Sequence, residues 1–230
     1  PLPQQQHTLK EGPMDQTAAT QLPSAKLLQL PPARAQQLPG DLQGWQLPTQ
    51  VAASGIEEAG NGRFLHAPAA ARQLVVKKSV VPWATVATLH ALKPDHTIQF
   101  VSTQDLEGFV KAMQAASGFE EKGVVDVLEN FVWSFDGTAA YLNWATWTIN
   151  HDPSNARLRF EPVRGCEGIS NNAESNCEAD QVFMMGYATK DLEPGQELLM
   201  DYAAFSMPEF YSEFAKSRGF VHVRDKVVQP

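Results

Sequence analysis

Apolar residues along this chain follow two periods, and the period changes near residue 102. Upstream of this point, β-branched and aromatic residues form short runs separated by Pro and Gly, a pattern that is typical of strands joined by turns. The runs lie at 63–67, 74–81, 85–89 and 97–101. The region 51–103 is therefore predicted to be rich in β-strands.

Between residues 102 and 135 the apolar residues recur every three or four positions, as they do on one face of a helix. Ser102 followed by Asp105 resembles a capping box at the start of a first helix. Gly118 and Gly123 bracket the junction with a second helix, so a helical pair is predicted. The apolar positions are Leu106, Phe109, Val110 and Met113 in the first helix and Val125, Leu128, Phe131 and Val132 in the second.

The last third of the chain returns to short strands and then to a helix. Residues 157–160 alternate between polar and apolar side chains. Two more apolar runs, 182–188 and 197–200, flank residues 193–196, whose Pro and Gly suit a tight turn. A third helix is predicted over 208–218. Its apolar stripe consists of Phe210, Tyr211 and Phe214.

Composition sets residues 1–51 apart and excludes some classes of protein. These residues are rich in Gln and Pro, which favours an extended or disordered N-terminal extension. The whole chain is 43% hydrophobic and 19% charged, which is ordinary for a globular protein. No apolar run approaches the roughly 20 residues of a membrane span, and no secretory signal is recognised. We expect an intracellular protein of the nucleus, the cytoplasm or an organelle.

Charge and cysteine content narrow the possible partners. A net charge of −8 disfavours direct nucleic-acid binding, which requires clustered Lys and Arg. The same charge suits a basic peptide as partner, although it equally improves solubility. Cys166 and Cys177 are the only cysteines of the sequence, and two thiols cannot complete a tetrahedral zinc site. No metal site is predicted.

Two polar clusters carry the candidate chemistry. The first is Asn150-His151, followed by Pro153 and Asn155, and the second is Gly-Gln-Glu-Leu-Leu-Met-Asp-Tyr at 195–202. Together they resemble the two signature motifs of the SET-domain protein lysine methyltransferases, an Asn-His pair followed by Pro and Asn, and a Gly-x-Glu-Leu-x-x-Asp-Tyr. The second motif is complete here. The first is shortened, and aromatic residues stand where the family has an Arg upstream of Asn150.

The resemblance implies a mainly β fold with short helices, the SET-like β-clip, in which small sheets surround a C-terminal pseudoknot. The domain would span residues 52–205, with 102–135 as a helical insert and 206–230 as a helical C-terminal extension. Many members have a zinc-binding, cysteine-rich segment that closes the active site. Because this chain lacks one, we expect the helix over 208–218 to cover the lysine channel instead.

The resemblance also implies S-adenosylmethionine as cofactor. In the family, a Gly-x-Gly turn near the start of the domain brings the backbone against the cofactor, where a Cβ would obstruct it. Taken alone, a Gly-x-Gly is weak, because most such pairs are only turns. The Asn-His pair could likewise only cap a turn. The residues expected to bind the cofactor are Gly60, Asn61, Gly62, Arg63, Phe64, Asn150 and His151.

By the same resemblance, Tyr202 is the expected catalytic residue. It would orient the lysine amine and the methyl group of the cofactor for methylation of a protein substrate such as a histone. A catalytically weak or inactive SET-like scaffold is an alternative, favoured by the altered first motif. A plain β-rich interaction domain is another, if both motifs occur by chance. The expected walls of the lysine channel are Tyr141, Trp144, Phe205 and Tyr211, and each could instead be an ordinary core residue.

Overall fold

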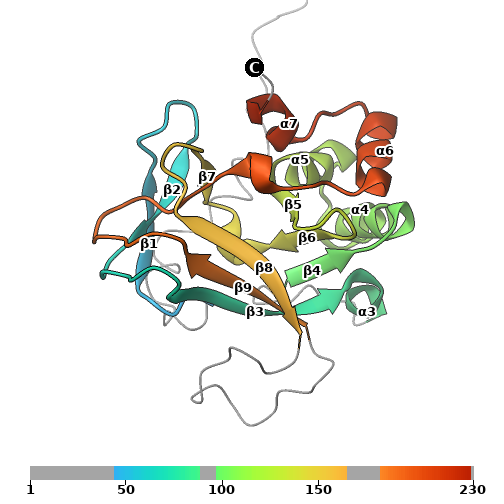
Figure 1. The fold of residues 1–230 in the computed structure, drawn as a ribbon. Coiled ribbons are helices and arrows are strands. Elements are labelled where there is room, and N and C mark those ends of the chain that lie inside the picture. Colours follow the sequence, from blue (N-terminus) through green and yellow to red (C-terminus); the bar gives the residue numbers. More distant parts are fainter. Residues whose placement is uncertain (1–43, 89–96, 165–181, 229–230) are drawn as a thin grey trace, which may run out of the picture.

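The computed structural model describes residues 44–88, 97–164 and 182–228 (Figure 1). The fold is mainly β, with small sheets and short helices. The N-terminal stretch 1–43, and the loop that contains Cys166 and Cys177, lie outside the described residues. The strands are β1 (Thr49–Ala53), β2 (Asn61–Leu65), β3 (Leu74–Pro82), β4 (Thr97–Phe100), β5 (Val132–Ser134), β6 (Ala140–Asn143), β7 (Asn150–His151), β8 (Leu158–Arg164), β9 (Val182–Ala188) and β10 (Leu199–Met200).

Helices gather at one end of this β framework (Figure 1). The α-helices are α3 (Trp83–Thr88), α4 (Thr103–Ser117), α5 (Glu121–Phe131), α6 (Glu209–Arg218) and α7 (Val223–Val228), and the 3-10 turns are η2 (Trp144–Thr146) and η3 (Tyr202–Ala204). The predicted cap of α4 is confirmed, because the Ser102 side chain accepts a hydrogen bond from Asp105 N. The helices predicted at 102–135 and 208–218 are confirmed as α4, α5 and α6, but the second helix ends at Phe131, and Val132, which was assigned to it, begins strand β5.

The strand predicted at 85–89 is wrong, because residues 83–88 form helix α3. Trp83 and Val86 are each 5% exposed. Three residues apart, they share one face of a helix, whereas in a strand they would point to opposite faces. Burying each side chain stabilises the fold by about 1.5–3 kcal/mol. This exceeds the roughly 1 kcal/mol span of β-propensity that favoured a strand.

The largest sheet is mixed and has the strand order β5-β6-β4-β3-β9-β8. Strands β3 and β4 are parallel, and the other neighbours are antiparallel. A separate hairpin pairs β1 with β2. The residues before β1 belong to the same body, because the buried Trp45 donates through Nε1 to Ala145 O at 3.2 Å. The folded unit therefore begins ahead of the boundary expected at residue 52.

The chain around β10 is enclosed by two segments from much earlier in the sequence. On one side, Leu198 N donates to Arg63 O at 2.7 Å, in strand β2. On the other side, β10 pairs in parallel with β7, and Asp152 N donates to Met200 O at 3.1 Å. Residues 196–201 thus pass between β2 and β7, as the predicted C-terminal pseudoknot requires.

Two hydrophobic clusters fill the molecule. One lies where the hairpin, the large sheet and β10 meet, and it includes Trp45, Phe160 and Met200. The other joins α3, α4, α5 and α6 to strands β4 and β6, and it includes Phe100 and Tyr211. Ion pairs fasten the C-terminal helices over the second cluster. Arg218 of α6 pairs with Glu107 and Glu121, and Lys226 of α7 pairs with Glu129.

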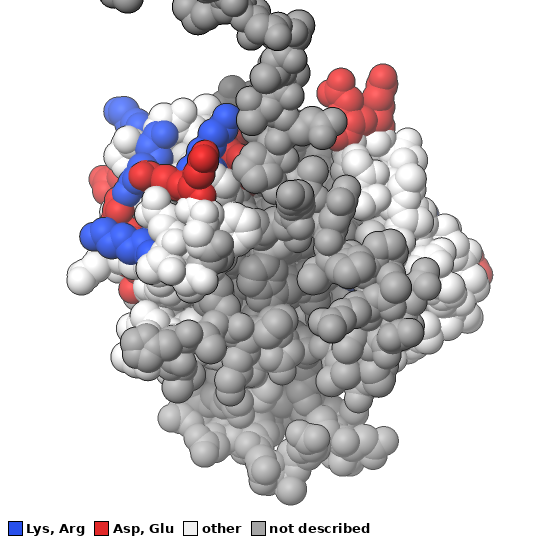
Figure 2. Space-filling view, turned by 180° about the vertical axis from the view of Figure 1, so that it is seen from behind, with Lys and Arg blue, Asp and Glu red and all other residues white. Residues whose placement is uncertain are grey.

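Acidic and basic side chains are interleaved over the helical end of the molecule, on the face seen in Figure 2. They form no broad surface of one sign there. Among the described residues, none of the helices is long and apolar enough to cross a membrane. Nor do three His, Cys, Asp or Glu side chains gather as a metal site anywhere in the described ranges.

Candidate functional site

The parallel pair β7–β10 brings the two sequence motifs together. Leu199 lies opposite Asn150, and Met200 lies opposite His151. The chain then turns at Asp201, whose carboxylate caps η3 by accepting a hydrogen bond from Ala203 N at 2.9 Å. This cap sets the direction of the chain at Tyr202. The Asp-Tyr end of the second motif therefore lies directly against the Asn-His pair.

Tyr202 is held by two hydrogen bonds to the first motif. Its hydroxyl donates to Ile149 O at 2.7 Å, and its backbone N–H donates to His151 Nδ1 at 2.9 Å. Burial raises the pKa of the Tyr202 phenol to about 12. The hydroxyl is therefore protonated at neutral pH. Its one hydrogen is used in the bond to Ile149 O, so the hydroxyl presents an acceptor oxygen to a ligand.

His151 links the two motifs through one defined tautomer. Because Nδ1 accepts from Tyr202 N, the proton of the neutral ring is assigned to Nε2. The ring lies against Tyr202, with centroids 5.0 Å apart. Asp201 Oδ1 is 4.0 Å from Nδ1.

Asn150 has a fixed amide orientation. Its Nδ2 donates to Asn61 O at 3.1 Å and to Glu197 Oε1 at 2.9 Å, and both of these partners are acceptors. Glu197 is itself held by Ser54 Oγ at 2.8 Å and by Gly55 N at 3.3 Å. Both amide hydrogens of Asn150 are thus used within the protein. The group that it presents to a ligand is the acceptor Oδ1.

The two glycines of the Gly-x-Gly turn serve different needs. Gly60 has a positive φ of 70°, a conformation that favours glycine. A Cβ on Gly62 would lie 2.0 Å from Glu197 Oε1. The structure therefore explains the need for glycine at position 62 without invoking the approach of a cofactor. The missing side chain makes room for the carboxylate that orients Asn150.

Arg63 and Phe64 follow this turn on β2. Arg63 points inward: its Nη1 donates to Thr49 Oγ1 at 2.8 Å, and its guanidinium lies 5.2 Å from the ring centroid of Trp45. Burial lowers the pKa of this guanidinium to about 10. Phe64 forms a β-bridge with Glu197. The structure thus places the Arg63 side chain in the core.

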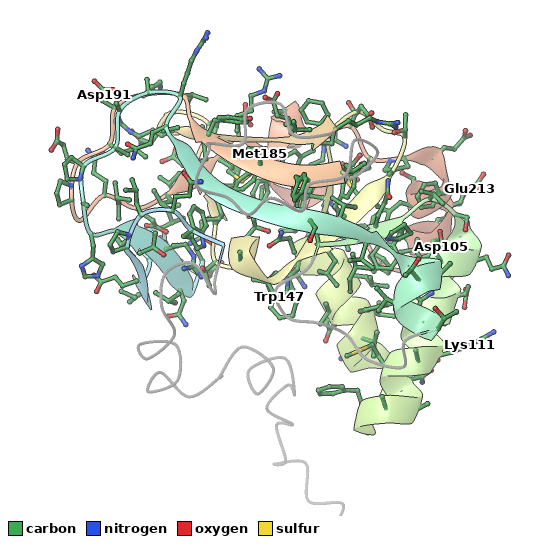
Figure 3. The ribbon with its side chains drawn as sticks, turned by 90° about the horizontal axis from the view of Figure 1, so that it is seen from below. Asp105, Lys111, Trp147, Met185, Asp191 and Glu213 are labelled. Atoms are coloured by element: carbon green, nitrogen blue, oxygen red, sulfur yellow. The ribbon has the colours of Figure 1, made fainter. Side chains whose placement is uncertain are left out.

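An open pocket lies beside Tyr202. About 400 Å³ of space not filled by atoms lies in it and in front of it, including the solvent at its mouth. Trp147, labelled in Figure 3, directly follows η2. Its ring stacks on that of Phe131 at the end of α5, with centroids 4.8 Å apart. Twelve residues line the pocket: Asn130, Phe131, Val132, Trp133, Thr146, Trp147, Ile149, Met200, Tyr202, Phe205, His222 and Val223.

Of the four residues expected to form the walls of the lysine channel, only Phe205 is found to line the pocket among the side chains that the structure describes. Phe205 lines the pocket and stacks on Tyr202, with ring centroids 5.7 Å apart. Tyr141 does not line it, because this side chain is buried behind Trp133, at 5.6 Å between centroids. The side chain of Trp144 lies outside what the structure describes. Tyr211 lies elsewhere, since it is 1% exposed and its hydroxyl donates to Leu128 O at 2.6 Å.

The helix expected over 208–218 does not line the pocket beside Tyr202. Helix α6 packs its aromatic stripe, including Phe214, into the second hydrophobic cluster. The C-terminal residues that reach the pocket are His222 and Val223, at the start of α7. Sequence reasoning missed these two residues, together with Trp147 and Phe131. Trp147 was recognisable as one of the aromatics that stand where the family has an Arg.

Comparisons with known proteins add little to this geometry. No protein-family model and no curated protein matches the chain. A structure of the Chaetomium thermophilum polycomb repressive complex 2 aligns at 15% identity and a TM-score of 0.38, over 68% of this chain and 15% of that one. The same complex bound to S-adenosylmethionine aligns at 12% and 0.43, over 75% and 17%. A candidate histone methyltransferase of Plasmodium falciparum aligns at 11% and 0.36, over 68% and 94%. Alignments with such low TM-scores identify no relative.

Proposed function

We propose that this chain is an S-adenosylmethionine-dependent protein lysine methyltransferase with a SET-like fold. One observation supports this above all. Tyr202 ends a complete Gly-x-Glu-Leu-x-x-Asp-Tyr motif, and it is bonded at 2.7 Å and 2.9 Å to the segment that contains the Asn-His pair. Two motifs that lie far apart in the sequence thus form one site, and that site opens into an aromatic pocket.

The residues around Asn150 fit the polar end of the cofactor. Within the described residues no donor reaches Asn150 Oδ1, because both contacts of this amide are made through Nδ2. A free acceptor of this kind suits the ammonium group of S-adenosylmethionine, which is a donor. Asn61, at the exposed edge of β2, would provide neighbouring backbone contacts. When bound, the cofactor supplies an electrophilic methyl group on a sulfonium sulfur.

The pocket beside Tyr202 would hold the lysine side chain. A lysine amine, with a pKa of about 10.4 in water, is mostly protonated at neutral pH and must lose its proton before it can react. The aromatic walls remove water, which disfavours the buried N–H groups of a protonated amine and so promotes loss of its proton. The Tyr202 hydroxyl and Ile149 O lie together at one wall, where they can orient the amine and shape the electrostatics of the reaction.

The alternative is a SET-like protein that binds partners without catalysis. The inward-facing Arg63 and the Trp147 side chain, in a stretch where the family has an Arg, favour it. Calorimetry with S-adenosylmethionine separates the two functions, since the enzyme requires a single saturable site. Incubation with labelled cofactor and a panel of histones and cell extract then tests transfer. Absence of cofactor binding would leave the scaffold function standing.

A further inference from the structure

Aromatic side chains dominate the pocket beside Tyr202. Five of its twelve lining residues are aromatic, namely Phe131, Trp133, Trp147, Tyr202 and Phe205. They come from α5, β5, the segment after η2, and the chain from η3 onward. Three ring contacts hold them in place: Phe131 with Trp147 at 4.8 Å, Tyr202 with Phe205 at 5.7 Å, and Trp133 with Phe205 at 5.8 Å. Several rings that surround one opening can bind an alkylated ammonium group through cation–π attraction.

The pocket carries no formal charge among its described lining residues. It contains no Asp, Glu, Lys or Arg side chain. Its one titratable nitrogen base, His222, is neutral in this arrangement, because Nε2 donates to Val132 O at 2.6 Å and Nδ1 accepts from Arg224 N at 3.2 Å. A cation that enters is therefore neither repelled by a positive charge nor paired with a carboxylate.

The hydrogen-bond acceptors that line the pocket are all uncharged. Ile149 O already accepts from Tyr202, and the hydroxyl oxygens of Tyr202 and Thr146 keep lone pairs while they donate to Ile149 O and Asn143 O. A primary ammonium group has three N–H donors, and uncharged acceptors compensate only part of the cost of taking them out of water. Each N-methyl group replaces one donor by an apolar surface that suits the rings. The walls therefore favour a methylated ammonium over an unmethylated one.

We propose that this pocket selects N-methylated lysine side chains, so that the substrate of the site is a lysine that already bears one or two methyl groups. The proposal rests on the proposed function only in assigning this pocket to the lysine. Selectivity itself is a property of binding, and it is measurable without the cofactor. Methyl transfer and methyl-lysine preference can therefore succeed or fail separately.

The test is a calorimetric titration of the full chain, without S-adenosylmethionine, using N-acetyl-lysine amides that bear zero, one, two or three Nζ-methyl groups. A carbon isostere, with a neutral tert-butyl group in place of the trimethylammonium, is titrated in parallel. We expect the trimethylated probe to bind about fivefold or more tightly than the unmethylated one. The isostere should bind more weakly than the cation, because it lacks the attraction between charge and ring.

Phe131→Leu removes one ring of the cage and keeps an apolar side chain. This variant should lose most of the preference for methylated probes. Phe119→Leu is the matched control, because Phe119 is also half-buried against the second hydrophobic cluster and does not line the pocket. It should keep the preference, and the two variants should have similar melting temperatures.

Three results would overturn the proposal. These are equal binding of the unmethylated and trimethylated probes, binding of the isostere as tight as that of the cation, or no binding of any probe. If labelled cofactor is transferred to lysine but the preference is absent, the proposed function stands and this inference fails. A clear preference without any methyl transfer would instead indicate a binding module for methylated lysine.

Discussion

Two tyrosines of this chain make the same hydrogen bond in different surroundings. Tyr202 donates to Ile149 O at 2.7 Å, and Tyr211 donates to Leu128 O at 2.6 Å. Burial raises the pKa of both phenols. Tyr202 lines an open pocket next to the Asn-His pair, whereas Tyr211 is enclosed among α4, α5 and α6. A buried hydroxyl bonded to a carbonyl is thus a structural feature in one place and a candidate reactive position in the other.

The difference shows what identifies a site in this fold. Neither the pKa shift nor the hydrogen bond distinguishes Tyr202, because Tyr211 has both. What distinguishes Tyr202 is the convergence of two distant motifs with a pocket that a ligand can enter. Substituting the two tyrosines in the same way should therefore separate a functional hydroxyl from a structural one.

The largest effect is expected from Tyr202→Phe. Loss of one positioned polar group in a water-poor site typically lowers turnover about a hundredfold or more. The ring and its stacking on Phe205 remain, so the melting temperature and the affinity for S-adenosylmethionine should stay near those of the parent protein. Single-turnover methylation, measured beside thermal melting, checks this. A wild-type rate in the variant would remove Tyr202 from the mechanism.

A smaller loss is expected from Asn150→Ala. The variant lacks the oriented Oδ1, and hydrogen bonds to a charged group are worth roughly 1.5–3 kcal/mol, so the affinity for S-adenosylmethionine should fall about tenfold or more. Asn155→Ala is the matched control, because that amide donates to Asp152 within its own turn. Calorimetry compares the two variants. Equal affinities in folded proteins would show that Asn150 does not hold the cofactor.

Tyr211→Phe tests whether the Tyr211 hydroxyl contributes to stability but not to catalysis. The variant leaves Leu128 O without its partner in the core, which costs roughly 1–3 kcal/mol of unfolding free energy. For a chain of this size the melting temperature should fall by roughly 2–4 °C per kcal/mol. Single-turnover methylation at 25 °C should remain near the parent rate. A rate loss as large as that of Tyr202→Phe would mean that the two hydroxyls are not distinguished by their surroundings.

The smallest effect concerns pH and His222. Burial, together with the neighbouring charge of Arg224, lowers the pKa of this imidazole in the folded chain, against the opposing effects of the Val132 hydrogen bond, Asp225 and Glu129. The unfolded state, with a pKa of about 6.5, then binds more protons at acid pH, so the stabilisation is present above about pH 6.5 and is lost as the pH falls below it. The melting temperature should therefore drop between about pH 7 and pH 5. His222→Gln should reduce the drop, and an unchanged drop would assign it to other groups.

The sequence predicted those elements whose signals are local. The cap of α4 and the apolar faces of α4 and α6 are encoded within a few residues, and the structure has them. The face predicted for α5 is right only in part, because Val124 and Val127 are buried beside Leu128 in place of Val125, and Val132 lies in β5. The strand predicted at 85–89 failed because the contacts of Trp83 and Val86 with distant residues decided the local conformation. Local patterns do not contain such contacts.

The site was predictable where a motif specified it and not where only packing did. Tyr202, Asn150 and His151 come together as their motifs implied. The assignment of Tyr211 to the channel followed from the aromatic stripe of a helix that comes soon after Tyr202 and was expected to close the site, but α6 packs that side chain into the second cluster. Glu197, which orients Asn150 and explains Gly62, lay within the motif but was given no role, because its partners Ser54 and Gly55 are distant in the sequence.

Transfer of a labelled methyl group from S-adenosylmethionine tests the central claim most directly. The parent chain, Tyr202→Phe and Tyr211→Phe are each incubated with labelled cofactor, histones and cell extract, and the products are hydrolysed to amino acids. We predict label in N-methylated lysine with the parent chain and with Tyr211→Phe. With Tyr202→Phe, the amount of label should be lower by about a hundredfold or more. Label absent from lysine in all three, or equal in all three, would contradict this account.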